Sequence, residues 1–483
     1  MMRPQNLLFV FSDEHTREIT GCYGNSVIKT PNMDRLAARG TVFDNAYTNC
    51  PICVPARASL ATGRYVHDIR LWDNGMPYHG VPTGWGHRLI AAGHQVTAMG
   101  KLHYRSATDP TGWSEEIGTL HVVDGEGDIA GAIRSGMVER SAVKQLSREA
   151  GRGDSTYIRY DTRTTAGAVR WLREEAPRHT DRPWVLFVGL VLPHFPLVAP
   201  PFFYDLYPEL PPPRLYGAED RPNHPVIKEL RRVQAYDRYF DAESLRRART
   251  AYHGMVSYLD FCLGQIVEAL ESSPAGRDTR ILYTTDHGDN IGHRGMWGKS
   301  NMYEESASIP MILSGADVPV GHRVAEPVSL VDVYQTVIEG VGLSLEEEER
   351  ETLPGHSLVR IANGDCPERT VLSEYHAVGA ITGFFMIRHE RWKYVHYVGA
   401  PPQLFDLAED PHETTDRAAD PRCTDVLRVC EARLRAVVDP EAANAQAFAD
   451  QAAQIERHGG RDALMARGSF GYTPAPGEPP RYD

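Results

Sequence analysis

The residue types best suited to covalent chemistry are Cys53 and Arg57, in the run Cys-Val-Pro-Ala-Arg. Pro55 in a first turn, the helix formers at 56–61 and Gly63 as a stop predict a helix that begins at Cys53. The free N–H groups and the dipole at that end of a helix favour a developing oxyanion. Arg57 lies one turn later on the same face, where its guanidinium can stabilise an anionic nucleophile and bind an oxyanion substrate.

Two other interpretations of Cys53 are open at this point. With Cys50 it forms a Cys-Pro-Ile-Cys pair, which is typical of a redox couple or of half a zinc site. No second pair of this kind follows, and the remaining cysteines are scattered at positions 22, 262, 366, 423 and 430. A free cysteine is also commonly a buried structural residue. The other motifs of the chain are therefore needed to distinguish a nucleophilic Cys53 from a redox, zinc-binding or structural cysteine.

Carboxylates follow two apolar runs that are typical of buried strands. Asp13 and Glu14 come soon after Leu-Leu-Phe-Val-Phe, and Asp286 with His287 follows Ile-Leu-Tyr-Thr-Thr. Paired carboxylates at a strand end suit a hard divalent cation, although an isolated aspartate is more often a helix cap or a surface acid. A histidine among oxygen ligands leaves the identity of the metal open.

Lys101 and His103 follow a third apolar segment, at 96–100. An ammonium group can bind an oxyanion, and an imidazole can act as a general base near neutral pH. Taken alone, the pair is better explained by a solvated lysine and a histidine that only packs. Its position after a predicted strand is what makes it a candidate for the same site.

These groups need a scaffold that brings strand ends together. Apolar runs typical of buried strands lie at 7–11, 42–47, 96–100, 184–192, 280–284 and 311–313. Helical spacing is found at 32–39, which Gly40 is expected to close, and at 162–176, 245–272 and 330–341. The alternation predicts a doubly wound, mostly parallel α/β sheet flanked by helices, with ligands bound beyond the carboxyl ends of its strands. Residues 193–243 are rich in proline and are expected to form an irregular active-site excursion.

The sequence changes character after about residue 365. Short β-like runs at 370–374, 383–387 and 392–397 precede a helix near 425–437. They predict a smaller C-terminal α+β subdomain that contains an antiparallel sheet. We therefore divide the chain into a catalytic α/β domain at 1–365, the subdomain at 366–440 and a C-terminal arm at 441–483. The arm, rich in alanine and glutamine at its start, is expected to lie on the body or on a neighbouring subunit.

Composition limits the class of protein. The 483 residues, 42% of them hydrophobic, can bury a large core. The net charge of −13 without a long basic run disfavours nucleic acid as a partner. The N-terminal apolar run of five residues is too short for a signal-peptide core or a membrane span, so no membrane partner is expected. Seven cysteines without framework spacing favour reduced thiols and a cytoplasmic location.

The combination of motifs resembles the formylglycine-dependent sulfatases of the alkaline phosphatase superfamily. The most specific element is Cys-x-Pro-x-Arg, and Asp-His-Gly after a strand and Gly-Lys-x-His accompany it in the right order. The resemblance extends over roughly residues 5–400. Phe-Ser-Asp, Pro-Ala-Arg-Ala-Ser, Gly-Lys-Leu-His and Arg-Trp-Lys-Tyr-Val are similar to runs in choline sulfatases.

The resemblance implies a nucleophile and a metal. Cys53 would be oxidised to formylglycine by a formylglycine-generating enzyme, and the hydrate of that aldehyde would attack sulfur. Asp13, Glu14, Asp286 and His287, together with residue 53, would bind one divalent ion. Calcium is the usual ion of the family, whereas manganese or zinc would suit the histidine better.

The resemblance also implies roles for the cationic residues. Lys101 would bind the sulfate, and His103 would accept a proton when the covalent sulfated intermediate collapses. His194, in Leu-Pro-His-Phe-Pro, and Lys299 would contact the oxyanion near the leaving oxygen and assist departure of the alcohol. Asn74 matches a residue that lines the substrate pocket in some relatives.

The leading hypothesis is therefore hydrolysis of a small sulfate monoester. Phosphonate monoester and phosphodiester hydrolases share two of the motifs and are the alternative, but the Gly-Lys-x-His pair favours a sulfatase. Choline sulfatases have His-Pro-His-Asp-Pro where this chain has Leu-Pro-His-Phe-Pro, which leaves choline recognition open. A binding protein that is never converted at Cys53 is a third possibility.

The alcohol half of the substrate is not encoded in a motif. Five aromatic residues near the motifs could form a wall for it, although each is more often part of a core: Trp72, Tyr78, Trp85, Phe195 and Trp297. The long arm and the resemblance together predict a homo-oligomer, a dimer or a tetramer.

Overall fold

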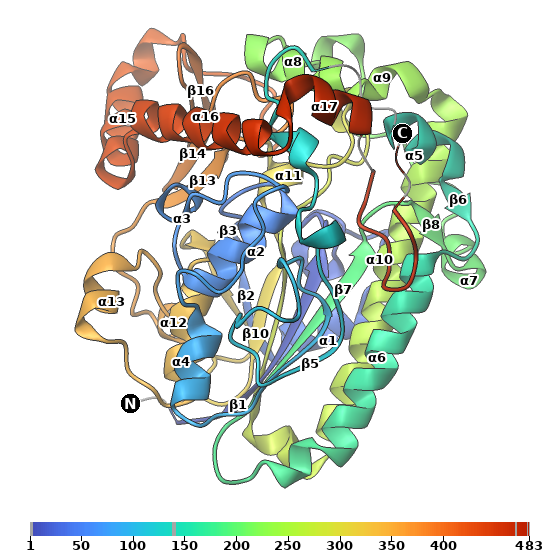
Figure 1. Cartoon of the computed structure of the whole chain (residues 1–483), viewed down its shortest axis with the longest axis vertical. Coiled ribbons are helices and arrows are strands. Elements are labelled where there is room, and N and C mark those ends of the chain that lie inside the picture. Colours follow the sequence, from blue (N-terminus) through green and yellow to red (C-terminus); the bar gives the residue numbers. More distant parts are fainter. Residues whose placement is uncertain (1–2, 138–141, 469–470, 481, 483) are drawn as a thin grey trace.

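A single large sheet forms the centre of the protein in the computed structural model, which describes residues 3–137, 142–468, 471–480 and 482 (Figure 1). In spatial order its strands are β11 (His322–Val324), β2 (Gly40–Phe43), β10 (Met311–Ser314), β9 (Thr279–Thr285), β1 (Asn6–Asp13), β7 (Val185–Pro193), β4 (Val96–Lys101) and β5 (Glu115–Leu120). Only β10 runs antiparallel to its neighbours in this sheet. The predicted doubly wound, mostly parallel sheet is confirmed.

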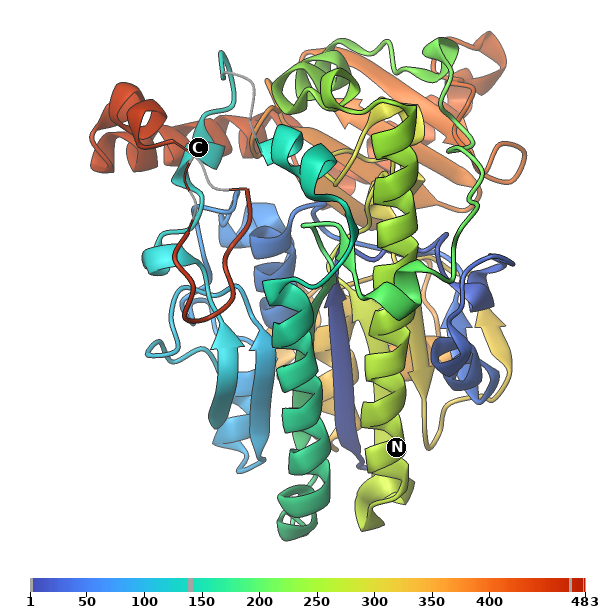
Figure 2. The ribbon, with the colours of Figure 1, turned by 90° about the vertical axis from the view of Figure 1, so that its right-hand side faces the viewer.

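Helices cover both faces of the sheet because its central strands are apolar on both sides. Leu8 and Val10 of β1 pack with α1 (Pro31–Ala38), α6 (Thr156–Glu174) and α10 (Ala242–Glu271). The alternate residues of β1, at 7, 9 and 11, pack with α2 (Cys53–Thr62), α4 (Trp85–Ala91) and α12 (Asp332–Gly340). Figure 2 shows α6 and α10 side by side in front of the strands.

A second, antiparallel sheet follows the main one, as the sequence predicted. It consists of β13 (Val371–Tyr375), β14 (Phe384–His389), β15 (Trp392–Tyr397) and β16 (Ala400–Asp406). Helix α15 (Thr424–Val437) packs on it through Cys430 and Leu434.

The C-terminal arm is helical and lies on its own chain. Helix α16 (Pro440–Arg457) begins with Asp439 as N-cap, whose carboxylate accepts a hydrogen bond from the backbone N–H of Ala442. Asp450 of α16 accepts a hydrogen bond of 2.8 Å from the indole of Trp72. Helix α17 (Gly460–Arg467) follows. The Asp-Pro start and the alanine-rich sequence are ordinary helix signals that our sequence analysis did not use.

Two boundary predictions near residue 40 are wrong. Gly40 begins β2 instead of closing the preceding helix, which ends at Ala38. The run at 42–47, predicted as one strand, is divided between β2 and β3 (Ala46–Tyr47), which pairs with β12 (Val328–Ser329) outside the main sheet. The residues Asp44 and Asn45 separate the two strands, and both types favour turns over strands.

The proline-rich stretch at 193–243 is less irregular than predicted. It contains α7 (Pro201–Tyr204), α8 (Pro225–Gln234) and α9 (Tyr236–Tyr239). Proline occupies the first helical position of α7 and α8, where it favours a helix start. Two elements of the main fold, β5 and α4, were not predicted. Strand β5 lacks a clear apolar run because it is a partly exposed edge strand that begins with two glutamates.

The remaining helices and strands are short. They are α3 (Val66–Ile69), α5 (Ala142–Glu149), α11 (Glu304–Ala307), α13 (Glu347–Thr352), α14 (Leu358–Ala362), β6 (Gly151–Arg152) and β8 (Val198–Ala199). Among the helices of the described residues, none combines the length and the apolar character that crossing a membrane requires.

Candidate active site

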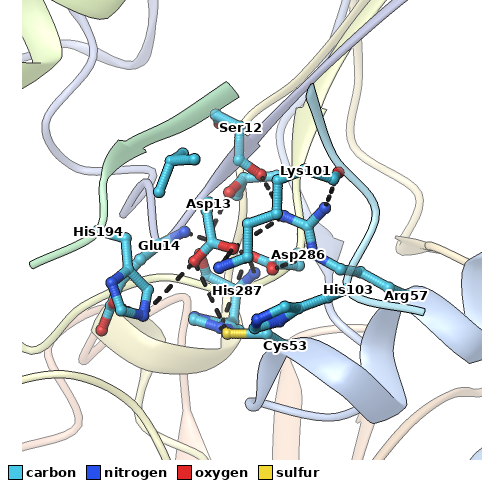
Figure 3. Close-up of polar contacts among 12 residues, drawn as sticks. Ser12, Asp13, Glu14, Cys53, Arg57, Lys101, His103, His194, Asp286 and His287 are labelled. Carbon is cyan, nitrogen blue, oxygen red and sulfur yellow. Dashed lines mark hydrogen bonds and ion pairs between the residues drawn. The ribbon is translucent and has the colours of Figure 1, made fainter. Parts of the chain in front are cut away.

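The strand ends and one helix start converge at the carboxyl edge of the main sheet. Asp13 is the last residue of β1, Lys101 is the last residue of β4, and Asp286 follows β9. Cys53 is the first residue of α2, as predicted. The four side chains are buried and lie together in Figure 3.

Arg57 holds this group together. Its guanidinium donates hydrogen bonds of 2.9 Å from Nε to Asp286 Oδ2 and from Nη2 to Asp13 Oδ2. A third, of 2.8 Å, runs from Nη1 to the backbone carbonyl of Lys101. Arg57 thus binds protein acceptors with all three nitrogens, so it fixes two carboxylates instead of pointing a free fork at a substrate.

Four side chains could hold a divalent ion: Asp13, Cys53, Asp286 and His287 place one potential ligand atom each within 4.8 Å of one another. Cys53 Sγ lies 3.1 Å from His287 Nε2 and 3.7 Å from Asp13 Oδ1. His287 Nδ1 lies 3.1 Å from the carbonyl of Gly288, an arrangement that keeps the proton on Nδ1 and leaves the Nε2 lone pair for a metal. Two carboxylates and one imidazole this close together form a ligand set that suits a hard or borderline divalent cation.

The electrostatics around Asp13 keep its carboxylate ionised. Burial alone would raise the pKa of Asp13, but the charge of Lys101, whose Nζ lies 2.6 Å from Asp13 Oδ2, and that of Arg57 hold it well below its usual range. Burial, together with the negative charge of Asp13, raises the pKa of the Cys53 thiol to about 12. An unmodified Cys53 is therefore a protonated thiol at neutral pH, a weak nucleophile.

Glu14 follows Asp13 directly, and its backbone N–H donates a 3.1 Å hydrogen bond to Asp286 Oδ1. It joins Asp13 and His194 in a second potential ligand group, and its Oε2 accepts a 2.8 Å hydrogen bond from Lys299 Nζ. Its other oxygen, Oε1, is buried without a hydrogen-bond partner among the described residues. Burial raises the pKa of Glu14 well above its usual value. The predicted metal ligand Glu14 is thus near the cluster but is bound to a lysine.

His194 and Lys299 form a contact pair. Lys299 Nζ lies 3.1 Å from His194 Nε2, and His194 Nδ1 lies 2.7 Å from the carbonyl of Phe195. The carbonyl needs a proton on Nδ1, so Nε2 is the acceptor and Lys299 the donor. Burial, followed by the charge of Lys299, lowers the pKa of His194. Burial would also lower the pKa of Lys299, but nearby negative groups raise it. The proton of this pair resides on Lys299.

Strained backbone marks the site. Glu14, His103 and Ser300 have φ values of 68°, 59° and 81°, in the left-handed region that side-chain-bearing residues rarely adopt. Each such residue costs on the order of 1–3 kcal/mol, and clusters of them are typical of functional sites. Asn74 also contributes to the local structure, since its Oδ1 accepts a hydrogen bond of 3.1 Å from Val54 N in the first turn of α2.

A cavity of about 1050 Å³, part of it open to solvent, lies over these groups. Cys53, Asn74, His103, His194 and Lys299 all line it. Of the five aromatic residues considered for a wall, only Phe195 borders this cavity, and the other four are buried in cores.

Sequence reasoning missed several residues of the cavity wall, among them Asp128, Leu146, Val378, Tyr472 and Thr473. They come from segments remote from the motifs and carry no local signal. The thiol of Cys53 contacts His287 and Asp13, and all seven cysteines are free.

Known proteins with similar sequences or folds indicate what kind of site this is. The family model described as Sulfatase matches residues 5–343, and the model for the N-sulphoglucosamine sulphohydrolase C-terminal region matches residues 292–439. The choline-sulfatase of Rhizobium meliloti (strain 1021) is 32% identical over 438 residues, which cover 86% of this chain and 83% of that protein. Arylsulfatase K of Homo sapiens is 30% identical over 445 residues, 86% of this chain and 78% of the relative. The solved phosphonate monoester hydrolase of Agrobacterium radiobacter has the same fold, with a TM-score of 0.71, 23% identity and coverage of 90% of this chain and 95% of the other.

Proposed function

The chain belongs to the sulfatase family of sulfuric ester hydrolases, and we propose that it hydrolyses a small sulfate monoester with a formylglycine at position 53 as the nucleophile. The observation that supports this most strongly is the position of Cys53. It begins α2, lies within 3.7 Å of Asp13 Oδ1 and His287 Nε2, and faces a cavity with two lysines and two histidines nearby.

A formylglycine hydrate would supply the hydroxyl that the protonated thiol of Cys53 cannot provide. A divalent cation held by Asp13, Asp286, His287 and residue 53, with Glu14 beside them, would supply positive charge that favours ionisation of that hydroxyl. Calcium is the ion we propose, with manganese or zinc as alternatives because of the imidazole ligand.

The chain's own residues bind and orient the ester. Arg57 fixes both carboxylates in position, and Lys101, whose Nζ lies beside Asp13, supplies a positive charge that would attract the sulfate oxygens. Lys299 carries the proton of its pair with His194 and lines the cavity, where it can donate that proton to the departing alcohol oxygen. His103, which also lines the cavity, is the base for the release of sulfate, and Asn74 and His194, two further lining residues, contact the substrate.

The alcohol half of the substrate is proposed from the relatives and from the cavity. The named relatives are a choline-sulfatase and arylsulfatases, so choline sulfate and an aryl sulfate are the first substrates to assay. The cavity wall is mostly apolar and includes Phe195, Val378 and Tyr472, which suits an apolar alcohol.

Peptide mass spectrometry across residue 53, in protein from the native host, tests the nucleophile. Conversion to formylglycine lowers the peptide mass by about 18 Da, the mass of H₂S less one oxygen. A converted peptide with turnover of a sulfate ester supports the proposal. An unmodified cysteine in fully active protein would contradict it.

A phosphonate monoester or phosphodiester hydrolase is the second candidate. The cations Lys101 and Lys299 attract any tetrahedral oxyanion, and the fold is shared with phosphonate monoester hydrolases. The ratio of aryl sulfate to phenyl phosphonate turnover decides between them, and activity on both esters is compatible with this site.

The setting of the protein is part of the proposal. We propose domain boundaries at 365 and 440, maturation by a formylglycine-generating enzyme, and a cytoplasmic location in keeping with seven free cysteines. The resemblance also favours a dimer or a tetramer. The arm no longer supports that state, because it lies on its own chain. Light scattering of the purified protein would establish the oligomer.

A further inference from the structure

The C-terminal end of the chain places a hydroxyl against His103. Thr473 Oγ1 lies 2.8 Å from His103 Nε2, although 370 residues separate the two in sequence. Both side chains are buried, and both line the cavity that Cys53 also lines. Figure 2 shows the last part of the chain descending along the body toward the carboxyl ends of the strands. The segment that ends the chain is therefore part of the active-site wall.

A second contact holds the backbone of Thr473. Tyr157 of α6 donates a 2.5 Å hydrogen bond from its hydroxyl to the backbone carbonyl of Thr473. The ring of Tyr157 also packs edge-on against Tyr472, with centroids 5.2 Å apart. Tyr472 in turn has its ring centroid 6.3 Å from that of Phe195. Tyr157 thus anchors the backbone of Thr473, and the rings of Tyr472 and Phe195 pack beside it.

The contact bears on which nitrogen of His103 carries a proton. Nδ1 is buried and has no hydrogen-bond partner among the described residues, whereas Nε2 faces the Thr473 hydroxyl. A buried N–H without an acceptor is rarer and more costly than an acceptor without a donor. A hydroxyl can accept from Nε2–H, so the favoured neutral form has its proton on Nε2 and a free lone pair on Nδ1.

We propose that Thr473 is a positioning residue that fixes His103 in the tautomer whose Nδ1 is the base for sulfate release. This inference rests on the proposed formylglycine chemistry. In the step concerned, Nδ1 takes the proton of the free hydroxyl at residue 53, and the electrons of that O–H bond form the C=O bond. The C–O bond to sulfate breaks, and sulfate leaves with its electron pair. No other reactant is needed.

Two substitutions separate positioning from packing. Thr473→Val keeps the shape of the side chain and removes the hydroxyl, whereas Thr473→Ser keeps the hydroxyl. With Val, we expect turnover of an aryl sulfate to fall about tenfold. A loss of this size is typical when a functional histidine loses the hydrogen-bond partner that orients its ring. Rapid quenching and intact-mass analysis should show a larger fraction of covalently sulfated enzyme, because release is the step that slows. Thr473→Ser should restore both quantities toward wild type.

A spectroscopic readout is independent of turnover. In protein labelled with ¹⁵N-histidine, the His103 signals, assigned by their absence in His103→Gln, should show a protonated Nε2 and an unprotonated Nδ1. Thr473→Val should shift this tautomer ratio, and Thr473→Ser should not. A proton on Nδ1 in the wild-type protein, or equal losses of turnover in the Val and Ser variants, would overturn the proposal.

The design separates two kinds of failure. If wild-type protein with verified formylglycine turns over no sulfate ester, the proposed function fails, while the tautomer measurement still tests the role of Thr473. Should Thr473→Val not fold, Tyr157→Phe provides a second test. It removes the tyrosine hydroxyl that anchors the backbone carbonyl of Thr473 and leaves the side-chain hydroxyl of Thr473 in place. It should shift the tautomer ratio to a smaller extent, and an unchanged ratio would count against the proposal.

Discussion

The site has two parts of different origin. The floor consists of Asp13, Cys53, Arg57, Lys101 and Asp286, which stand at strand ends or on the first turns of α2. The wall consists of residues from remote segments that line the cavity above the floor: Asp128, Leu146, Phe195, Val378 and Tyr472. The floor is fully buried and held by short ion pairs, whereas the wall is mostly apolar and comes from loops and short helices. Under the proposed function, the floor would determine the reaction class, and the wall could vary with the substrate without disturbing the floor.

Removing the proposed nucleophile, at position 53 of the floor, should have the largest effect. Cys53→Ala is expected to lower turnover of an aryl sulfate by about 10⁴-fold or more, as is usual when a nucleophile is lost. Cys53→Ser should instead accept sulfate once, because the carbon that bears the serine sulfate ester has no second hydroxyl whose deprotonation could expel sulfate and form an aldehyde. Intact-mass analysis after incubation with substrate should detect the trapped sulfated protein. Turnover of Cys53→Ser at the wild-type rate would contradict the assigned nucleophile.

The ion pairs of the floor come next. Asp286→Asn removes one partner of the buried Arg57 pair and one candidate ligand. We expect the free energy of unfolding to fall by about 3–5 kcal/mol, because the guanidinium keeps its charge with one carboxylate fewer. Chemical denaturation measures this loss, and elemental analysis of the same samples should show less bound metal. Asp154→Asn, in an exposed pair with Arg159, is the control and should change little.

The contrast between floor and wall also explains what could be predicted from sequence. The residues Asp13, Lys101 and Asp286 follow strongly apolar runs, and parallel strands end at one edge, so their proximity was predictable. The helix that begins at Cys53 was predictable from Pro55 and Gly63. The sheet and its flanking helices followed from the same periodicity.

The wall was not predictable, because long-range packing places it. Tyr472 and Thr473 reach the site only after α16 and α17 carry the chain across the body. Gln451 of α16 binds Asp73 at 2.8 Å, next to Asn74, and nothing local to either residue indicates this contact. The role of Arg57 as a clamp on two carboxylates likewise depends on strand ends that lie far apart in sequence.

A change in the wall should alter affinity and leave the reaction nearly intact. Tyr472→Ala removes a ring that borders the cavity and packs on Tyr157. We expect KM for an aryl sulfate to rise about 10-fold, in line with about 1–3 kcal/mol for a lost apolar contact, with kcat less affected. Tyr472→Phe keeps the ring and is the matched control. Steady-state kinetics on aryl and choline sulfates would show whether the wall discriminates between them, and a fall in kcat alone would argue against the division between floor and wall.

The contact with the smallest expected effect on turnover lies between α3 and the second sheet, where His67 meets Glu374 of β13. His67 Nδ1 lies 2.8 Å from Glu374 Oε1, and Glu374 also contacts His376. Burial would lower the pKa of His67, but Glu374 outweighs it and raises this pKa to about 8. Because the folded pKa exceeds that of the unfolded chain, near 6.5, the pair stabilises the protein fully below pH 6.5, and this contribution is lost as pH rises through 8. The loss should be about 2 kcal/mol. Denaturation from pH 6 to 9 measures it, and Glu374→Gln should flatten this part of the profile. Equal pH dependence in wild type and variant would show that His67 does not gain its proton from this contact.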